Sequence, residues 1–158
     1  MKMRDIVHER AVVPDLASRE RDGVVAELVD ALIEAGAAKQ ELRDELIRSV
    51  ISREERGSTG FGKGVAVPHV KHEDVDSMAA AVGVSADGVD FNALDKQPVY
   101  SFILLLSPAQ KPDEHLQAME VIFKNLSQDT FRKFLRQAGS VQDVMTLMDE
   151  ADSNQLAG

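Results

Sequence analysis

Apolar residues recur at helical spacing in two segments near the start of the chain. The first segment begins at Ser18, and Gly36 is placed to end it. Its inward positions share this spacing: Val24, Val25, Leu28, Val29, Leu32 and Ile33. A second helix is predicted from Gln40 to about Arg53, with apolar residues on one face and charged residues on the other. The pattern therefore predicts two consecutive amphipathic helices, the second leading into a glycine-rich stretch.

The clearest strand signal is a nearly continuous apolar run from Val99 to Leu106, which lies between two prolines. Such a run favours burial on both faces, so we expect this strand at the centre of a sheet. The small-residue segment from Met78 to Val84 is a second strand candidate, and a turn is expected at residues 85–88. The mixed segment before Pro14 leaves two possibilities open, because its short apolar pairs could form a strand or simply cover the core.

Three more helices are predicted towards the C-terminus. The first starts near Pro112, a favourable residue for a first helical turn. Its expected inward face consists of Leu116, Met119, Ile122, Phe123 and Leu126. A short helix marked by Phe131, Phe134 and Leu135 should end at Gly139, and residues 140–143 resemble a capping box for the last helix. The polar tail, residues 151–158, is expected to be disordered.

Length and composition indicate one globular domain. Hydrophobic residues make up 44% of the 158 residues, and no repeat or linker divides the chain. We therefore predict a single α/β domain over residues 1–158, with a core at about 3–149. In it, a mixed central β-sheet is flanked by helices on both sides.

Charge and cysteine content narrow the classes of partner. The formal net charge of −9 repels nucleic acid and anionic membranes and favours a basic protein partner, although the same excess also serves solubility. The absence of cysteine excludes disulfides and thiolate metal sites and fits a reducing cytoplasm, which is the location we expect. No apolar run suggests a signal peptide or a membrane span, so we expect no direct insertion into a membrane.

One stretch concentrates the candidate chemistry. It places four glycines among eight residues before a short β-prone run, a proline and a histidine: Gly57-Ser58-Thr59-Gly60-Phe61-Gly62-Lys63-Gly64-Val65-Ala66-Val67-Pro68-His69. Pliable backbone followed by a short strand should hold the His69 imidazole at the rim of the core, with backbone amides nearby. That arrangement suits a histidine that meets a phosphate. The polar segment after it, residues 70–76, is predicted to be a loop.

Nucleotide-binding motifs do not fit this stretch. The spacing from Gly57 to Lys63 matches a P-loop, but Gly64 replaces the hydroxyl residue that would hold Mg²⁺. The context is also inverted, because a charged helix precedes the loop and a strand follows it. The dinucleotide fingerprint fails because its third glycine falls at the wrong spacing and no helix follows.

The same stretch and three later motifs resemble enzyme IIA domains of the fructose/mannitol class of the bacterial phosphotransferase system, and nitrogen-regulatory IIA proteins above all. The matching motifs are Arg53-Glu54 with the glycine run to His69, Phe91-Asn92-Ala93-Leu94-Asp95-Lys96-Gln97-Pro98-Val99, Leu104-Leu105-Leu106-Ser107-Pro108 and His115-Leu116. They keep the family's order over roughly residues 3–149. Phe61 and Lys63 depart from the pattern, since an aliphatic and a neutral polar residue are expected there.

The resemblance implies a role for two histidines. His69 would be the phosphoryl-accepting nucleophile, because histidine is nucleophilic in its neutral form near pH 7. His115 would stabilise the phosphoryl group from the start of a helix, where free amides and the dipole favour anions. On position alone, His69 could be an ordinary loop histidine and His115 a solvent-facing one. His8 and His72 are interpreted as structural, and a zinc site on His69 and His72 is not expected.

The remaining candidate residues bring donors to the same place. The resemblance implies that Arg53, rather than Arg56, pairs with phosphate oxygens or orients neighbouring carboxylates. The phosphoryl-binding loop would consist of Ser58, Thr59, Gly60 and Gly62. Turn chemistry explains the two hydroxyl residues equally well.

The function implied is that of a phosphocarrier without cofactor or metal. It would take its phosphoryl group, derived from phosphoenolpyruvate, from a phosphorylated HPr-like protein. The target could be a regulatory one, such as a kinase or ion transporter in a nitrogen-regulatory branch. A IIB domain in sugar uptake is the alternative, and a non-catalytic binding module is the second alternative. A histidine hydrolase is not favoured, because no water-activating carboxylate is recognisable.

Overall fold

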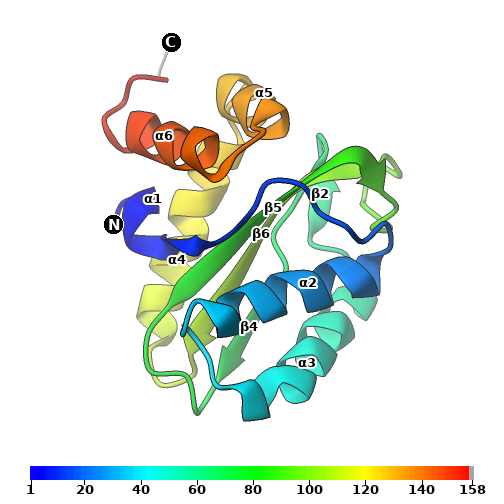
Figure 1. The fold of residues 1–158 in the computed structure, drawn as a ribbon, viewed down its shortest axis with the longest axis vertical. Coiled ribbons are helices and arrows are strands. Elements are labelled where there is room, and N and C mark those ends of the chain that lie inside the picture. Colours follow the sequence, from blue (N-terminus) through cyan, green and yellow to red (C-terminus); the bar gives the residue numbers. More distant parts are fainter. Residues whose placement is uncertain (157–158) are drawn as a thin grey trace.

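The computed structural model of the protein describes residues 1–156. Along the chain the elements are α1 (Met3–Ile6), β1 (Val7–Val13), α2 (Arg21–Glu34), the 3₁₀ helix η1 (Gln40–Leu42), α3 (Arg43–Glu55), β2 (Gly60–Gly62), β3 (Val65–Ala66), β4 (His69–His72), β5 (Ala79–Val89), β6 (Val99–Pro108), α4 (Pro112–Leu126), α5 (Asp129–Gln137) and α6 (Val141–Asp152). A mixed sheet lies between two layers of helices (Figure 1). This confirms the predicted fold class.

The apolar strand β6 is central, as predicted. It pairs antiparallel with β5 on one side and parallel with both β3 and β4 on the other. The main path of the sheet is β1-β5-β6-β3-β2, in which β1 runs parallel to β5 and β2 antiparallel to β3. Since β3 and β4 both run beside β6, the chain between Ala66 and His69 interrupts what would otherwise be one strand.

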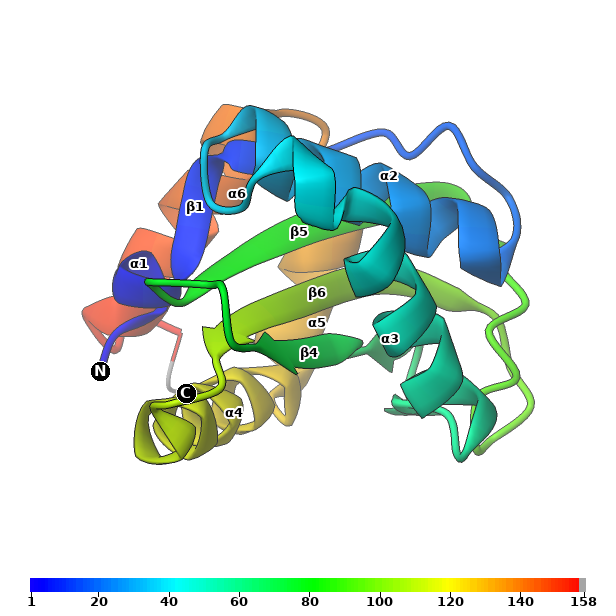
Figure 2. The same ribbon diagram turned by 90° about the horizontal axis from the view of Figure 1, so that it is seen from below.

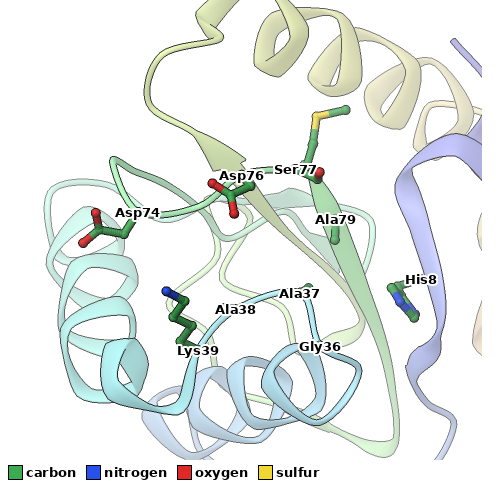
Figure 3. A pocket seen from close by; sticks show the side chains of 10 residues that line it. His8, Gly36, Ala37, Ala38, Lys39, Asp74, Asp76, Ser77 and Ala79 are labelled. Carbon is green, nitrogen blue, oxygen red and sulfur yellow. The ribbon is translucent and has the colours of Figure 1, made fainter.

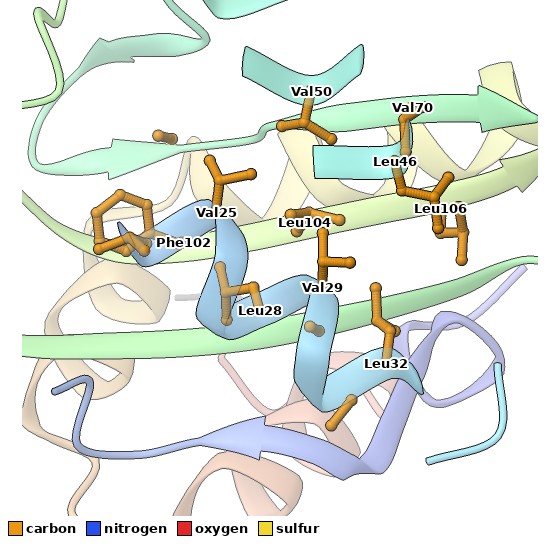
Figure 4. Close-up of a cluster of buried hydrophobic side chains, with 14 of the residues drawn as sticks. Val25, Leu28, Val29, Leu32, Leu46, Val50, Val70, Phe102, Leu104 and Leu106 are labelled. Atoms are coloured by element: carbon orange, nitrogen blue, oxygen red, sulfur yellow. The ribbon is translucent and has the colours of Figure 1, made fainter. Parts of the chain in front are cut away.

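Each face of the sheet carries its own hydrophobic core, because side chains alternate along β6. Phe102, Leu104 and Leu106 pack beneath α2 and α3 (Figure 4). Ile103 and Leu105 belong to the core under α1, α4, α5 and α6. The two helical layers are seen from below in Figure 2. Among residues 1–156, no helix is both long and apolar enough to cross a membrane.

Three predictions about strands need correction or completion. The expected loop at residues 70–76 begins as β4, because its polar residues gain backbone pairing with β6. The expected turn at residues 85–88 lies within β5. The strand accommodates these residues by a shift of register between Val84 and Val89 and by a positive φ at Gly88. The open choice before Pro14 resolves into the short helix α1 and the strand β1.

The expected inward face of the helix after Pro112 was wrong in part. Leu116 and Phe123 do not face inward, since they are 59% and 36% exposed, and the buried face of α4 instead includes His115 and Ala118. The predicted capping box of α6 forms only in half: the Asp143 amide donates a 3.0 Å hydrogen bond to Ser140 Oγ, but the Asp143 carboxylate accepts from the Gly139 amide instead of the Ser140 amide.

The expected disordered tail begins as ordered structure. Helix α6 continues to Asp152, whose carboxylate accepts a 2.6 Å hydrogen bond from the Met3 amide. Leu156 packs against the core under α4 to α6. These contacts tie the C-terminal segment to α1. The last two residues of the expected tail, 157 and 158, lie outside the described residues.

Candidate active site: a pair of histidines beside strand β6

The parallel pairing of β4 with β6 decides which way His69 points. His69 lies opposite Leu105, and Val70 lies opposite Leu106. Val70 belongs to the core beneath α2 and α3, so its neighbour His69 must face the opposite side of the sheet, towards α4. The half-buried His69 ring is therefore placed on the α4 side of the sheet, at the start of a strand whose backbone is anchored by β6.

A backbone group fixes the proton of His69. Its Nδ1 lies 2.9 Å from the carbonyl oxygen of Val67. Because a carbonyl oxygen can only accept, Nδ1 must carry the hydrogen. In the neutral ring the lone pair is then on Nε2. The sequence predicted a nucleophilic histidine without indicating which nitrogen would react; this contact leaves Nε2 as the nitrogen with the free lone pair.

His115 lies in the first turn of α4 and faces His69. The two ring centroids are 5.5 Å apart and the ring planes are inclined by 53°. His115 is 9% exposed, and its Nδ1 is 2.7 Å from Oγ of Ser107 near the end of β6. The predicted pair of histidines is thus brought together by the sheet and the helix that follows it.

The surroundings of His115 keep its ring neutral. Burial lowers the pKa of His115 to about 4, and repulsion from His69 when it is protonated, and from Lys71, acts in the same direction. A neutral imidazole has one N–H donor and one acceptor nitrogen. At neutral pH, His115 can therefore donate a hydrogen bond without adding a full positive charge next to His69.

The hydroxyl groups predicted to bind phosphate hold the loop itself. Ser58 Oγ donates to the Phe91 carbonyl at 3.0 Å and accepts from the Gly60 amide. The amide of Thr59 donates to the carboxylate of Glu54 at 3.0 Å, and its hydroxyl bonds to the same carboxylate. These contacts match the turn-chemistry alternative. Direct binding of a phosphoryl group by Ser58, Thr59, Gly60 or Gly62 stays a prediction.

Arg53 also engages the loop in this structure. Its guanidinium donates to the Gly57 carbonyl at 2.7 Å, which closes the turn between α3 and β2. The backbone takes positive φ at Gly62 (115°) and Gly64 (77°) on either side of Lys63, as the glycine content predicted. Arg53 therefore shapes the loop that leads to His69, while its contact with phosphate oxygens remains a prediction.

The departure at Phe61 has a structural counterpart. The Phe61 ring packs against Phe123 of α4, with centroids 5.1 Å apart. This contact joins the glycine-rich loop to the helix that carries His115. An aromatic residue at position 61 thus links the two segments from which the site is built.

The other two histidines lie in structural contacts. His72 Nε2 is 3.2 Å from Glu45 on α3, and its Nδ1 accepts from the Asp74 amide at 3.0 Å. His8 accepts a hydrogen bond from the Arg10 amide and lies at the rim of a separate hollow of about 440 Å³ (Figure 3). That hollow lies between the turn after α2 and the loop before β5, and neither His69 nor His115 lines it.

Two residues of this region were assigned no role from the sequence. Ser107 is the polar residue that ends the apolar run of β6, eight positions before His115. Glu54 is almost fully buried, 4% exposed, at the end of a helix otherwise marked by charge. The interruption of an apolar run was a usable signal for Ser107. Helical spacing was the signal for Glu54, because it lies four residues after buried Val50 and Glu55 does not keep that spacing.

Comparison with known proteins identifies the family. A family model described as "Phosphoenolpyruvate-dependent sugar phosphotransferase system, EIIA 2" matches residues 5–151. The chain belongs to this family. Membership makes it a IIA-type component of phosphotransfer, and the resemblance of the four motifs is confirmed.

The relatives include both sugar-specific IIA components and nitrogen regulatory proteins. The chain is 31% identical over 130 residues to a fructose-specific EIIA component of Haloferax volcanii, covering 82% of this chain and 83% of that protein. It is 33% identical over 128 residues to a nitrogen regulatory protein of Klebsiella oxytoca, covering 80% of this chain and 79% of that one. Against a fructose-specific EIIABC component of Bacillus subtilis, 30% identical over 152 residues, it covers 96% of its own length but spans only 24% of the relative.

Solved structures share the fold. Nitrogen regulatory protein IIA-Ntr from Neisseria meningitidis superimposes with a TM-score of 0.83 at 26% identity, covering 92% of this chain and 98% of that one. A complex of IIA mannitol with phosphorylated IIB mannitol from Escherichia coli gives 0.75 at 16% identity, covering 90% of this chain and 96% of that one, which supports the fold alone.

Proposed function

We propose that the protein is a phosphocarrier whose nucleophile is Nε2 of His69. The observation that carries the proposal is the fixed orientation of His69, with Nδ1 bonded to the Val67 carbonyl and a buried neutral imidazole beside it. The donor would be a phosphorylated HPr-like protein. No cofactor or metal is needed in this scheme, because neutral histidine is nucleophilic near pH 7.

The transfer exchanges one phosphorus–nitrogen bond for another. The bond to the donor's phosphohistidine breaks as a bond to Nε2 of His69 forms, and the donor ring recovers its lone pair. The proton of His69 stays on Nδ1 throughout, hydrogen-bonded to the Val67 carbonyl. Such transfers pass through a loose, nearly in-line transition state, in which positioning and electrostatic donors supply most of the catalysis. Here His115 would hydrogen-bond the phosphoryl oxygens, and Arg53 would add positive charge from the end of α3.

The acceptor forms the second part of the proposal. We favour a nitrogen-regulatory branch, in which phosphorylation of His69 alters the charge of a surface that docks on a target such as a kinase or ion transporter. The likeness to IIA-Ntr from Neisseria meningitidis supports it. Transfer to a IIB domain in sugar uptake is the alternative, supported by the fructose-specific relative. A cytoplasmic location belongs to the same proposal, since a cysteine-free chain fits a reducing compartment.

The test is intact mass after incubation with phosphoenolpyruvate and the general phosphotransferase proteins. The wild-type protein should gain one acid-labile phosphoryl group, and His69→Ala should gain none. His115→Ala should gain it more slowly, whereas His72→Ala is the matched control and should behave as wild type. Gain of phosphate by His69→Ala, or no gain by the wild type with cognate carriers, would refute the proposal and leave a non-catalytic binding module.

The branch is tested with the phosphorylated protein. Rapid loss of the phosphoryl group to a purified IIB domain would assign it to sugar uptake. Retention of the group, together with binding to a regulatory target that differs between the phosphorylated and unphosphorylated forms, would assign it to regulation.

A further inference from the structure

Ser107 is a buried hydroxyl group with one visible contact. Its side chain is fully shielded from solvent on β6, on the same face of the strand as Leu105. Oγ lies 2.7 Å from Nδ1 of His115. Within residues 1–156 this is the one hydrogen bond that the Ser107 side chain makes.

The direction of that hydrogen bond follows from what each group must satisfy. If Nδ1 of His115 donated to Oγ, the hydroxyl hydrogen of Ser107 would have no acceptor in a fully buried place. An unpaired buried polar group costs about 1–3 kcal/mol. If the hydroxyl donates instead, its hydrogen and the Nδ1 lone pair are satisfied by one bond. The second arrangement leaves the ring hydrogen of His115 on Nε2.

We propose that Ser107 is a positioning residue that holds neutral His115 in the tautomer protonated at Nε2, so that His115 presents a hydrogen-bond donor to the phosphoryl group on His69. The last clause rests on the proposed function, whereas the tautomer does not. The two histidines would then be arranged in opposite ways, with the hydrogen on Nδ1 in His69 and on Nε2 in His115.

This arrangement has a chemical advantage at a phosphoryl site. Phosphoryl oxygens are acceptors, so a ring nitrogen facing them must carry a hydrogen. The opposite tautomer would turn a lone pair towards an anionic group. A protonated imidazole would donate from both nitrogens whatever the tautomer. The low pKa of His115 prevents this at neutral pH, because the ring does not gain a second proton. The hydrogen-bond partner of Nδ1, Ser107, therefore determines which tautomer His115 adopts.

The test of the tautomer uses nitrogen NMR of ¹⁵N-histidine-labelled, unphosphorylated protein at pH 7.5. Wild-type His115 should show a protonated Nε2 and a bare, hydrogen-bonded Nδ1. In Ser107→Ala the Nδ1 resonance should shift towards that of a nitrogen without a donor, and a share of the other tautomer should appear. Ser107→Thr retains the hydroxyl and should restore the wild-type pattern. Ser101→Ala is the matched control, since Ser101 is also buried on β6, 2% exposed, but makes no hydrogen bond with His115.

Phosphorylation kinetics supply the second measurement. Loss of a well-oriented donor should slow phosphorylation of His69 about tenfold in Ser107→Ala, the effect expected for one hydrogen bond in the transition state. Ser107→Thr and Ser101→Ala should stay close to wild type. Thermal unfolding of all variants separates this effect from a loss of folded protein.

Either measurement can overturn the inference. A hydrogen on Nδ1 of wild-type His115, or an unchanged Nδ1 resonance in Ser107→Ala, would show that Ser107 does not set the tautomer. An altered tautomer with an unchanged rate would remove its role in transfer. If the tautomer shifts as expected but no variant is ever phosphorylated, the assignment of Ser107 stands and the proposed phosphocarrier function fails.

Discussion

His69 and His115 face each other with ring centroids 5.5 Å apart, and each ring is held through Nδ1 by a different kind of group. For His69 the partner is the backbone carbonyl of Val67, and for His115 it is the side chain of Ser107. Both partners belong to the sheet region, so the orientation of the pair depends on the register between β4 and β6. Two histidines far apart in sequence thus become one site through strand pairing.

The low pKa of His115 predicts a loss of stability in acid. Folded His115 resists protonation down to about pH 4, whereas the unfolded residue binds a proton near pH 6.5. Between these values the unfolded state takes up more protons, so the free energy of unfolding should fall as the pH is lowered. The contribution is on the order of 2 kcal/mol. Urea denaturation of wild type and His115→Gln at pH 7 and pH 4.5 measures it as the difference between the two proteins.

Other groups also titrate in this range, so the comparison needs a control. The variant His72→Gln should retain the wild-type decline, since burial and the neighbouring charges of His69 and Lys71 act on His115. An equal decline in wild type and His115→Gln would contradict the assignment.

The buried carboxylate of Glu54 should stabilise the start of the glycine-rich loop. It accepts hydrogen bonds from both the amide and the hydroxyl of Thr59. Glu54→Ala leaves both donors unpaired and should lower the free energy of unfolding by about 2–3 kcal/mol. Glu54→Gln, which can still bond to Thr59, should cost less. Exposed Glu55 provides the matched control, because Glu55→Ala should stay within about 0.5 kcal/mol of wild type. Equal losses in the two alanine variants, measured by urea denaturation, would rule out this role.

The left-handed backbone at Gly64 should be sensitive to substitution. Its φ is 77°, and a Cβ added there would lie 3.3 Å from Tyr100 Cδ2. Gly64→Ala should therefore destabilise the protein by about 1–2 kcal/mol. Gly57→Ala, in the same loop, would meet no atom within 4 Å and should be nearly neutral in thermal unfolding. Similar melting temperatures for the two variants would mean that the loop adjusts freely at Gly64.

Much of the fold could be predicted because its strongest signals are local. The apolar run of β6 indicated a central strand, and the helical spacing from Ser18 indicated α2, since both patterns record burial directly in the sequence. Strand β4 was not predicted because its residues are mostly polar and show no strand pattern. It forms because its backbone pairs with β6. The outward position of Leu116 was missed for a related reason, because the buried face of α4 includes the polar residue His115, which an apolar pattern does not indicate.

The candidate site was predictable as a set of residues but not as a set of bonds. His69 and His115 were found through motif and resemblance. Whether the Thr59 hydroxyl faces a ligand or Glu54 depends on how the loop folds back on α3, which no local pattern encodes. The contact of Ser107 with His115 likewise arises only when the end of a strand meets the first turn of a helix.

The break between β3 and β4 gives the two histidines unequal tolerance to mutation. The carbonyl that holds His69 belongs to the main chain at Val67, where the strand is interrupted, and every amino acid placed there would still supply it. The hydroxyl that holds His115 belongs to a side chain and can be removed by one codon change at Ser107. The contact that orients His69 therefore survives substitution at Val67, whereas the contact that orients His115 can be lost or altered by a single substitution during evolution.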